Sequence, residues 1–179
     1  MRALCMFAAI ALMGNAEAAP SRDVVEKLLA GVEARASADD VRRLGPGVDH
    51  VLVAIAIDDR VTRVRRQRAM AALAAVPSVE GRDLLRSIIK ERSRATEGAD
   101  VIDLSVCVRA LGAFGEEFAG DVLPLLAHPT GDVRIAAAES LARMRARATS
   151  GAMRLRLTIE REEDVRRALE RSLALLESK

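Results

Sequence analysis

The chain has 179 residues, half of them apolar, which argues against wholesale disorder and allows one domain around one core. Aromatic residues make up only 2% of the sequence, so flat ligand cages and base-stacking platforms lack the side chains to build them. The formal net charge of +2, from 28 basic and 26 acidic residues, gives no reason to expect a polyanionic partner.

The first residues have the pattern of a secretory signal peptide. Arg2 precedes an apolar run from Ala3 to Met13, and Ala16-Glu17-Ala18 has the form of an A-x-A cleavage site. We therefore expect residues 1–18 to be removed and the mature chain to be periplasmic or secreted; the alternative is an ordinary N-terminal helix or a misassigned start. No later segment has about 18 uninterrupted apolar residues, so stable membrane insertion of the mature chain is not expected.

Residues 19–60 are predicted to form an N-terminal helical cap or a diverged repeat. The segment from Ser21 to Ala34 carries apolar residues at helical spacing, and Ser21 is placed to cap the helix N-terminus. Gly45-Pro46-Gly47 then interrupts the chain. The apolar segment from Val48 to Ile57 follows, and a helix is favoured over a strand.

One helical spacing recurs four times within residues 62–177. Counted from a reference position in each copy, apolar or small residues stand at offsets 4, 7, 8 and 11, which lie on one face of an α-helix. The residue at offset 8 is leucine in every copy. In chain order these positions hold Ala69, Ala72, Leu73 and Val76; Cys107, Ala110, Leu111 and Phe114; Ala137, Ser140, Leu141 and Met144; and Leu169, Ser172, Leu173 and Leu176.

The intervals between the copies leave room for a second helix in each repeat. Arg82 to Arg92 and Glu117 to Ala127 carry apolar residues suited to that role. Thr149 to Glu160 is ambiguous, because its apolar residues alternate as in a strand but a helical stripe is also present. The stripe consists of Ala148, Ala152, Leu155 and Ile159. A helix is favoured, because neighbouring repeats supply helical partners and a two-helix unit buries its apolar face by stacking.

Gly131 to Leu141, with the sequence GDVRIAAAESL, resembles the first helix of a HEAT-like repeat of the short variety first associated with phycobilisome lyases. Asp164 to Leu169 resembles the next copy, and His128-Pro129 resembles the usual turn before the first. The match is good over residues 118–177 and fair over 62–117. The earlier copies depart from the pattern: one has its valine one place early, and the other lacks both the Val and the Arg.

The resemblance implies an all-α fold, a right-handed α-solenoid of about four stacked helix pairs that follows the N-terminal cap. In such repeats the Asp and Arg of the motif commonly link neighbouring units. By resemblance, Asp132, Arg134, Asp164 and Arg166 take this role here. The family motif is structural and specifies no activity.

The candidate binding residues lie on the expected second helix of the first repeat. In related repeats the second helices line the extended concave surface on which solenoids bind partners. Asp83, Arg86 and Lys90 share the side of the helix opposite Leu84, Leu85 and Ile88, and would face that surface.

No catalytic residue, metal ligand or cofactor site is expected. Cys107 occupies offset 4, where two other copies have alanine, so it is interpreted as a small core residue rather than a reactive thiol. If Cys5 leaves with the signal peptide, no internal disulfide is possible. His50 and His128 show no metal-ligand spacing and are interpreted as a helix-face residue and a turn residue.

The sequence therefore predicts an exported, non-catalytic scaffold that binds a protein partner. One alternative is an enzyme-associated or lyase-like protein, because HEAT-like repeats occur in bilin lyases. The other is nucleic-acid binding through a basic stretch whose arginines spread around the helix instead of forming one stripe. That stretch contains Arg60, Arg63, Arg65, Arg66 and Arg68. A signal peptide and the scarcity of stacking aromatics count against nucleic acid.

Overall fold

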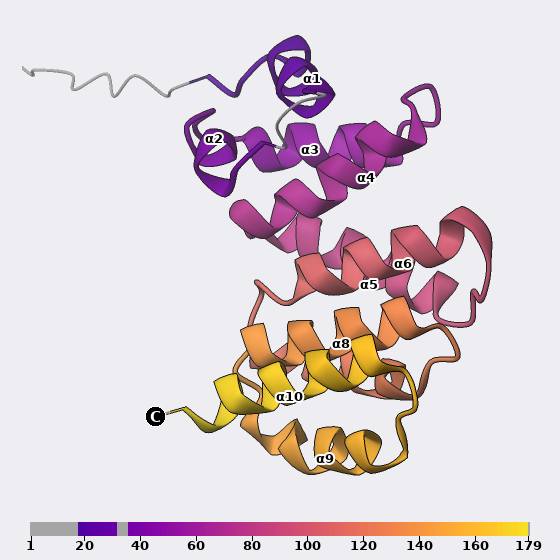
Figure 1. Ribbon diagram of the computed structural model, residues 1–179. Coiled ribbons are helices and arrows are strands. Elements are labelled where there is room, and N and C mark those ends of the chain that lie inside the picture. The colour runs from indigo at the N-terminus through magenta and orange to yellow at the C-terminus, as the bar shows by residue number, and fades with distance from the viewer. Residues whose placement is uncertain (1–17, 32–35, 179) are drawn as a thin grey trace, which may run out of the picture.

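The computed structural model describes residues 18–31 and 36–178, and every regular element in these ranges is an α-helix or a 3-10 helix (Figure 1). The expected all-α class is thus confirmed for the described part of the chain. The predicted signal peptide lies outside the described residues, apart from Ala18. Among the residues described, no helix has the length and apolar character needed to cross a membrane.

The N-terminal part contains α1 (Arg22–Ala30), α2 (Ala38–Arg42) and α3 (Val48–Ile57). The helix expected over Val48 to Ile57 is confirmed. Ser21 occupies the N-cap position of α1, as expected, but its side chain accepts no hydrogen bond from the helix. The short helix α2 was not predicted.

The repeat region contains the expected helices, several of which begin or continue as 3-10 turns. Its elements are α4 (Arg63–Ala72), η1 (Leu73–Ala75), α5 (Val79–Arg92), α6 (Gly98–Leu111), η2 (Glu116–Phe118), α7 (Ala119–Val122), η3 (Leu123–Ala127), α8 (Gly131–Arg143), η4 (Arg147–Thr149), α9 (Ser150–Ile159) and α10 (Glu163–Glu177). The ambiguous segment is the helix α9. The segment expected as one helix over Glu117 to Ala127 is divided into α and 3-10 turns, and Pro124 within it lacks the N–H that a continuous helix requires.

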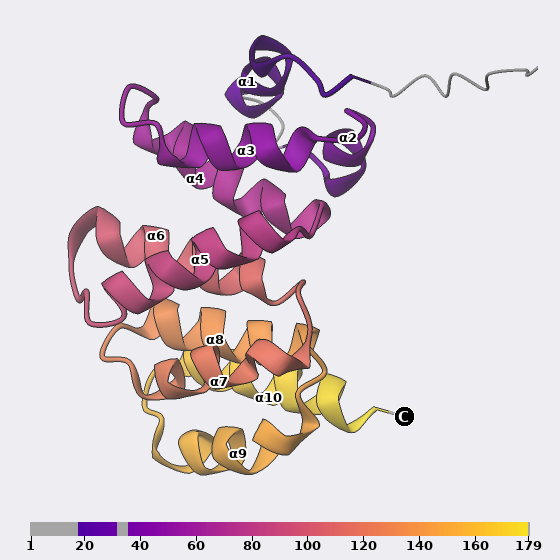
Figure 2. The same ribbon diagram turned by 180° about the vertical axis from the view of Figure 1, so that it is seen from behind.

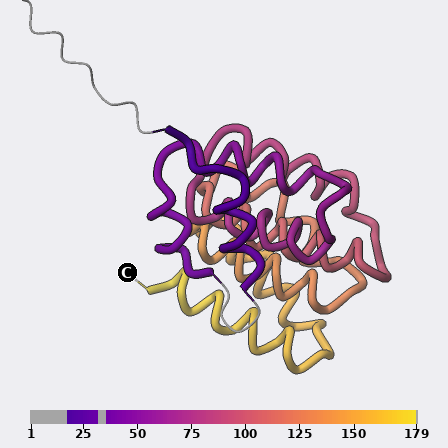
Figure 3. Tube along the Cα trace, turned by 90° about the horizontal axis from the view of Figure 1, so that it is seen from above, coloured from indigo at the N-terminus to yellow at the C-terminus, as the bar shows by residue number. Residues whose placement is uncertain are grey.

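The helices form two layers that follow the chain from one end of the molecule to the other. In one layer α4, α6, α8 and α10 pack successively on one another, and Figure 1 shows α6, α8 and α10 on the near side. In the other, α3, α5, α7 with η3, and α9 follow in the same order and lie nearest the viewer in Figure 2. The view from above, in which successive segments overlap, agrees with this stacking (Figure 3).

The core runs continuously from Val25 in α1 to Leu176 in α10, and the recurring leucine lies inside it. Leu73, Leu111 and Leu141 are fully buried, and Leu173 is 7% exposed. The small residues at offset 4 are also fully buried, which lets neighbouring helices approach closely. The predicted inward face of the first helices is therefore confirmed at these positions.

Candidate functional site

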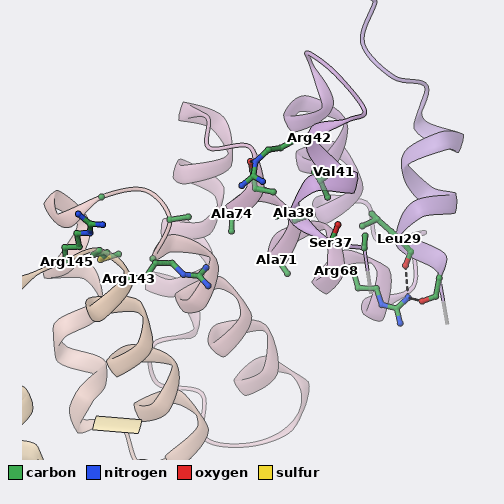
Figure 4. Close-up of a pocket in the computed structure, with 18 residues that line it drawn as sticks. Leu29, Ser37, Ala38, Val41, Arg42, Arg68, Ala71, Ala74, Arg143 and Arg145 are labelled. Carbon is green, nitrogen blue, oxygen red and sulfur yellow. Dashed lines mark hydrogen bonds between the residues drawn. The ribbon is translucent and has the colours of Figure 1, made fainter. Parts of the chain in front are cut away.

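A cavity of about 670 Å³ lies where α1, α2 and α4 face the C-terminal ends of α6 and α8 (Figure 4). Its floor is largely made of small side chains, which leave open the space that larger residues would fill. They are Ala71, Ala72, Ala74, Ala75, Gly112 and Ala113. Leu29, Val41 and Met144 add larger apolar surface, so the floor can bury apolar groups of a ligand.

Arginines line the cavity from three separate elements, and no carboxylate is among its described lining residues. Arg68 of α4 donates to the carbonyl oxygens of Leu29 and Gly31, at 2.7 and 2.9 Å, and so fastens α4 to the end of α1. These acceptors carry no net charge, so the hydrogen bonds do not neutralise the guanidinium. Arg42 of α2 donates to the Ala75 carbonyl at 3.2 Å, and its charge is paired with Asp39.

Arg143 and Arg145 form the opposite wall, at the end of α8 (Figure 4). Both stabilise the negative end of the α8 dipole by their position, which is a sufficient structural reason for basic residues there. In a shared hollow, however, charges of one sign also raise the local concentration of anions. The lining thus combines apolar surface with positive charge.

The backbone of Arg145 is strained. Its φ is +57°, in the left-handed region that favours glycine, and it ends α8 in a Schellman motif in which Ala146 N–H bonds to the Leu141 carbonyl at 3.1 Å. Gly115 holds the equivalent position in the preceding copy, since each of the two residues stands twelve places after the reference position of its copy. Gly115 also has a positive φ, but glycine lacks the Cβ atom that makes this conformation unfavourable for arginine. An arginine is therefore held at the cavity wall in a conformation that costs roughly 1 kcal/mol.

The predicted binding residues on α5 lie in the exposed part of the second layer. Arg86 donates to Asp121 of α7 at 2.6 Å and lies 5.4 Å from the centre of the Phe118 ring. Arg86 and Lys90 line a groove of about 400 Å³ together with Asp121 and Pro124. Asp83 instead accepts a hydrogen bond from its neighbour Arg82 at 2.8 Å, and this contact lowers the pKa of the Asp83 carboxyl.

Arg134 is buried and connects α8 to the start of α10. Its guanidinium donates to Glu160 at 2.8 and 3.1 Å, to Glu162 at 2.8 Å, and to the carbonyls of His128 and Pro129. Burial alone would raise the pKa of the Glu160 carboxyl. Hydrogen bonds from Arg134, Arg156 and the backbone outweigh burial and lower that pKa to about 2.

The other three residues expected to link neighbouring repeats, Asp132, Asp164 and Arg166, differ from Arg134 in their contacts. Arg166 donates to the carbonyl of Leu157 at 3.1 Å and so holds α10 against the end of α9. Asp164 pairs with Arg167 of its own helix at 2.6 Å, and Asp132 is exposed. Arg134 and Arg166 therefore join successive elements, whereas Asp164 makes a local contact.

Sequence reasoning missed Asp103 as a link between units. Asp103 is 4% exposed and accepts hydrogen bonds from Arg63 of α4, at 2.7 Å, and from Gln67 at 2.6 Å; Arg92 of α5 also pairs with it. Burial opposes ionisation of this carboxyl, but the hydrogen bonds from Arg63 and Gln67 prevail and lower its pKa. The only feature of the sequence that pointed to this link was the position of Asp103, a carboxylate at the start of a helix face that is otherwise apolar.

The basic stretch before and within α4 is engaged with the rest of the protein. Arg63 reaches Asp103, as described, and most of its neighbours have carboxylate partners of their own. The pairs are Arg60 with Asp58, Arg65 with Glu26, and Arg66 with Asp59. Arg63 and Arg65 therefore join α4 to other helices, whereas Arg60 and Arg66 pair with carboxylates close to them in sequence.

Cys107, His50 and His128 lie where they contribute to packing or to contacts within the fold. Cys107 is fully buried, as expected of a core residue, and burial raises the pKa of its thiol to about 12. His50 contacts Glu80 at 2.7 Å, and the Nδ1 atom of His128 accepts the Thr130 N–H at 3.1 Å. Over the described ranges, no group of His, Cys, Asp and Glu side chains is arranged to hold a metal ion.

No family model matches the chain, and no curated protein or solved structure is significantly similar to it.

Proposed function

We propose that this chain is an exported, non-catalytic protein-interaction scaffold built from HEAT-like repeats in a right-handed α-solenoid. Two observations support the repeat architecture. Equivalent positions of α4–η1, α6, α8 and α10 are buried in the same way, and each of these helices packs on the next. Stacks of this kind expose extended faces on which partners bind.

The observation that carries the binding function is the cavity beside α8. Elements that are far apart in sequence build it, and its lining consists mainly of small apolar residues and arginines. Such side chains bury apolar groups and pair with anions, which is the chemistry of recognition. The partner that fits is a protein segment in which acidic residues stand beside apolar ones.

Export is proposed on the pattern of residues 1–18. The mature chain would then begin at Ala19 and meet its partner in the periplasm or outside the cell. Enzyme-associated and nucleic-acid-binding roles remain the alternatives, but none of the contacts described favours either of them.

The experiment is photo-crosslinking in the native cell envelope, followed by capture of the tagged chain. One variant carries the photoreactive residue at Ala74 in the cavity and another carries it at Lys90 on α5. We expect one protein to be cross-linked from Ala74. The same protein cross-linked only from Lys90 would keep the scaffold function and move the site to the α5 groove. No cross-linked protein from either position would contradict the proposed function.

Charge reversal provides a matched test of the site. Arg143→Glu places a negative charge on the cavity wall, whereas Arg171→Glu makes the same change at an exposed position of α10 outside the cavity. We expect Arg143→Glu to weaken binding of the captured partner at least tenfold, about 1.4 kcal/mol, and Arg171→Glu to leave it unchanged. Equal binding by both variants would exclude the cavity as the docking site.

A further inference from the structure

The helical stripe of α9 faces solvent, not the neighbouring helices. It consists of Ala148 in η4 and Ala152, Leu155 and Ile159 in α9, all exposed. Leu155 and Ile159 are 68% and 63% exposed, whereas Met153, on the opposite side of the helix, is fully buried. In the described part of the chain, α9 lies at the end of the stack opposite α1 (Figure 1).

The stripe has a symmetric order of small and large residues. Ala152 and Leu155 are equally far in sequence from the midpoint between Met153 and Arg154, and so are Ala148 and Ile159. If the same stripe is laid antiparallel on this one about that midpoint, each large side chain meets an alanine. Gly151 beside the stripe has nothing within 4 Å of the position where a Cβ would stand, so a second helix can approach closely there.

We propose that this stripe is a self-association surface, on which α9 of a second copy packs antiparallel across a twofold axis. A twofold interface uses the same patch on both subunits and must therefore be complementary to itself. The order of alanines and large aliphatic residues makes the stripe complementary to itself. Binding of an unrelated partner would not require this self-complementary order. Terminal units of helical stacks ordinarily present a polar outer face, so the exposed leucine and isoleucine also call for a cover.

The expected dimer is weak and leaves the cavity open. A helix of 10 residues is about 15 Å long, so the contact area lies at the low end of specific interfaces. We therefore expect a dissociation constant on the order of micromolar. No residue of α9 lines the cavity beside α8, so both copies in the dimer keep that surface free.

Sedimentation velocity of the full chain over about 1 to 500 μM tests the proposal. We expect a monomer–dimer equilibrium that Leu155→Asp shifts at least tenfold toward monomer. The matched control is Leu175→Asp, because Leu175 is equally exposed, at 66%, but lies on α10 away from the stripe. A monomer at every concentration overturns the proposal, and so does an equal effect of the two substitutions.

Disulfide trapping tests the antiparallel register. In a Cys5→Ser background the only native thiol is that of Cys107, which is buried and does not compete. We expect a mixture of Ala152→Cys and Leu155→Cys chains to form the mixed disulfide several times faster than either variant pairs with itself. Lys90→Cys, on α5, serves as the control for random collisions. Mixed cross-linking no faster than self-pairing, or no faster than with the control, overturns the register.

Discussion

Leu141 shows how one residue reports on the whole repeat pattern. It holds the recurring leucine position in α8, and none of its side chain is exposed. We expect Leu141→Ala to lower the free energy of unfolding by about 2 to 5 kcal/mol, because the change removes apolar contact and leaves a cavity. Leu175→Ala makes the same change at an exposed site and is expected to cost about 0.5 kcal/mol or less. Denaturant titration of both variants is the measurement, and equal stabilities would show that the assigned inward face is wrong.

At Arg145 we expect one substitution to raise the stability of the protein and to weaken partner binding. Glycine at this position relieves the left-handed backbone but makes the unfolded chain more flexible, so we expect Arg145→Gly to raise the free energy of unfolding by about 0.5 kcal/mol. The same substitution is expected to weaken partner binding. Arg143→Gly is the control: its backbone is helical, so glycine there is expected to destabilise by about 1 kcal/mol. A destabilised Arg145→Gly variant would show that the arginine serves the fold alone.

The link between α8, α9 and α10 predicts a sensitivity to acid. The pKa of Glu160 is lowered in the folded protein to about 2 from an ordinary value of 4.5. The stability that this carboxylate contributes is therefore fully present above about pH 4.5, and it is lost as the pH falls toward 2. We expect Glu160→Gln to be less stable than the parent at pH 7 and to lose less stability between pH 5 and about pH 3. Urea unfolding at these pH values is the measurement, and parallel pH profiles of the two proteins would contradict the assignment.

The helices themselves were largely predictable because their evidence is local. A leucine in every repeat, with a small residue one turn before it in the first three copies and Leu169 in the fourth, specifies the buried face of α4–η1, α6, α8 and α10 from sequence alone. The helix α2 was missed because it has only five residues, and a reciprocal capping contact between Ser37 and Asp40 starts it. Periodicity needs a longer segment to be visible.

Contacts between elements were less predictable, because spacing along the chain does not show which side chains meet. The partners of Arg134 and Asp103 come from other helices, so sequence suggested a linking role for the arginine but not the carboxylate that it binds. The stripe of α9 illustrates the same limit: its periodicity predicted a helix correctly but could not show that this face is exposed. The cavity was missed because its lining comes from separate elements.

At the scale of the whole molecule, the pattern of residues 1–18 predicts export. We expect mass spectrometry of the protein recovered from cell envelope or medium to give a mature chain that begins at Ala19, because cleavage follows the small residues at positions 16 and 18. Substituting Ala18→Arg is expected to block processing and leave the full-length precursor. Full-length protein found in the cytoplasm of the unmodified strain would overturn the localisation.

The cavity also has a mechanical consequence. Because successive helices pack mainly on their neighbours, small changes in the packing between adjacent helices add up to a bend of the whole stack. The cavity bridges several of these helices, because residues of α2 near the N-terminal end and Arg143 at the end of α8 both line it. A ligand seated between them would hold these two points at a fixed separation. Occupancy would therefore stiffen the molecule over α2 to α8, while α9 and α10 beyond the cavity would stay free to bend.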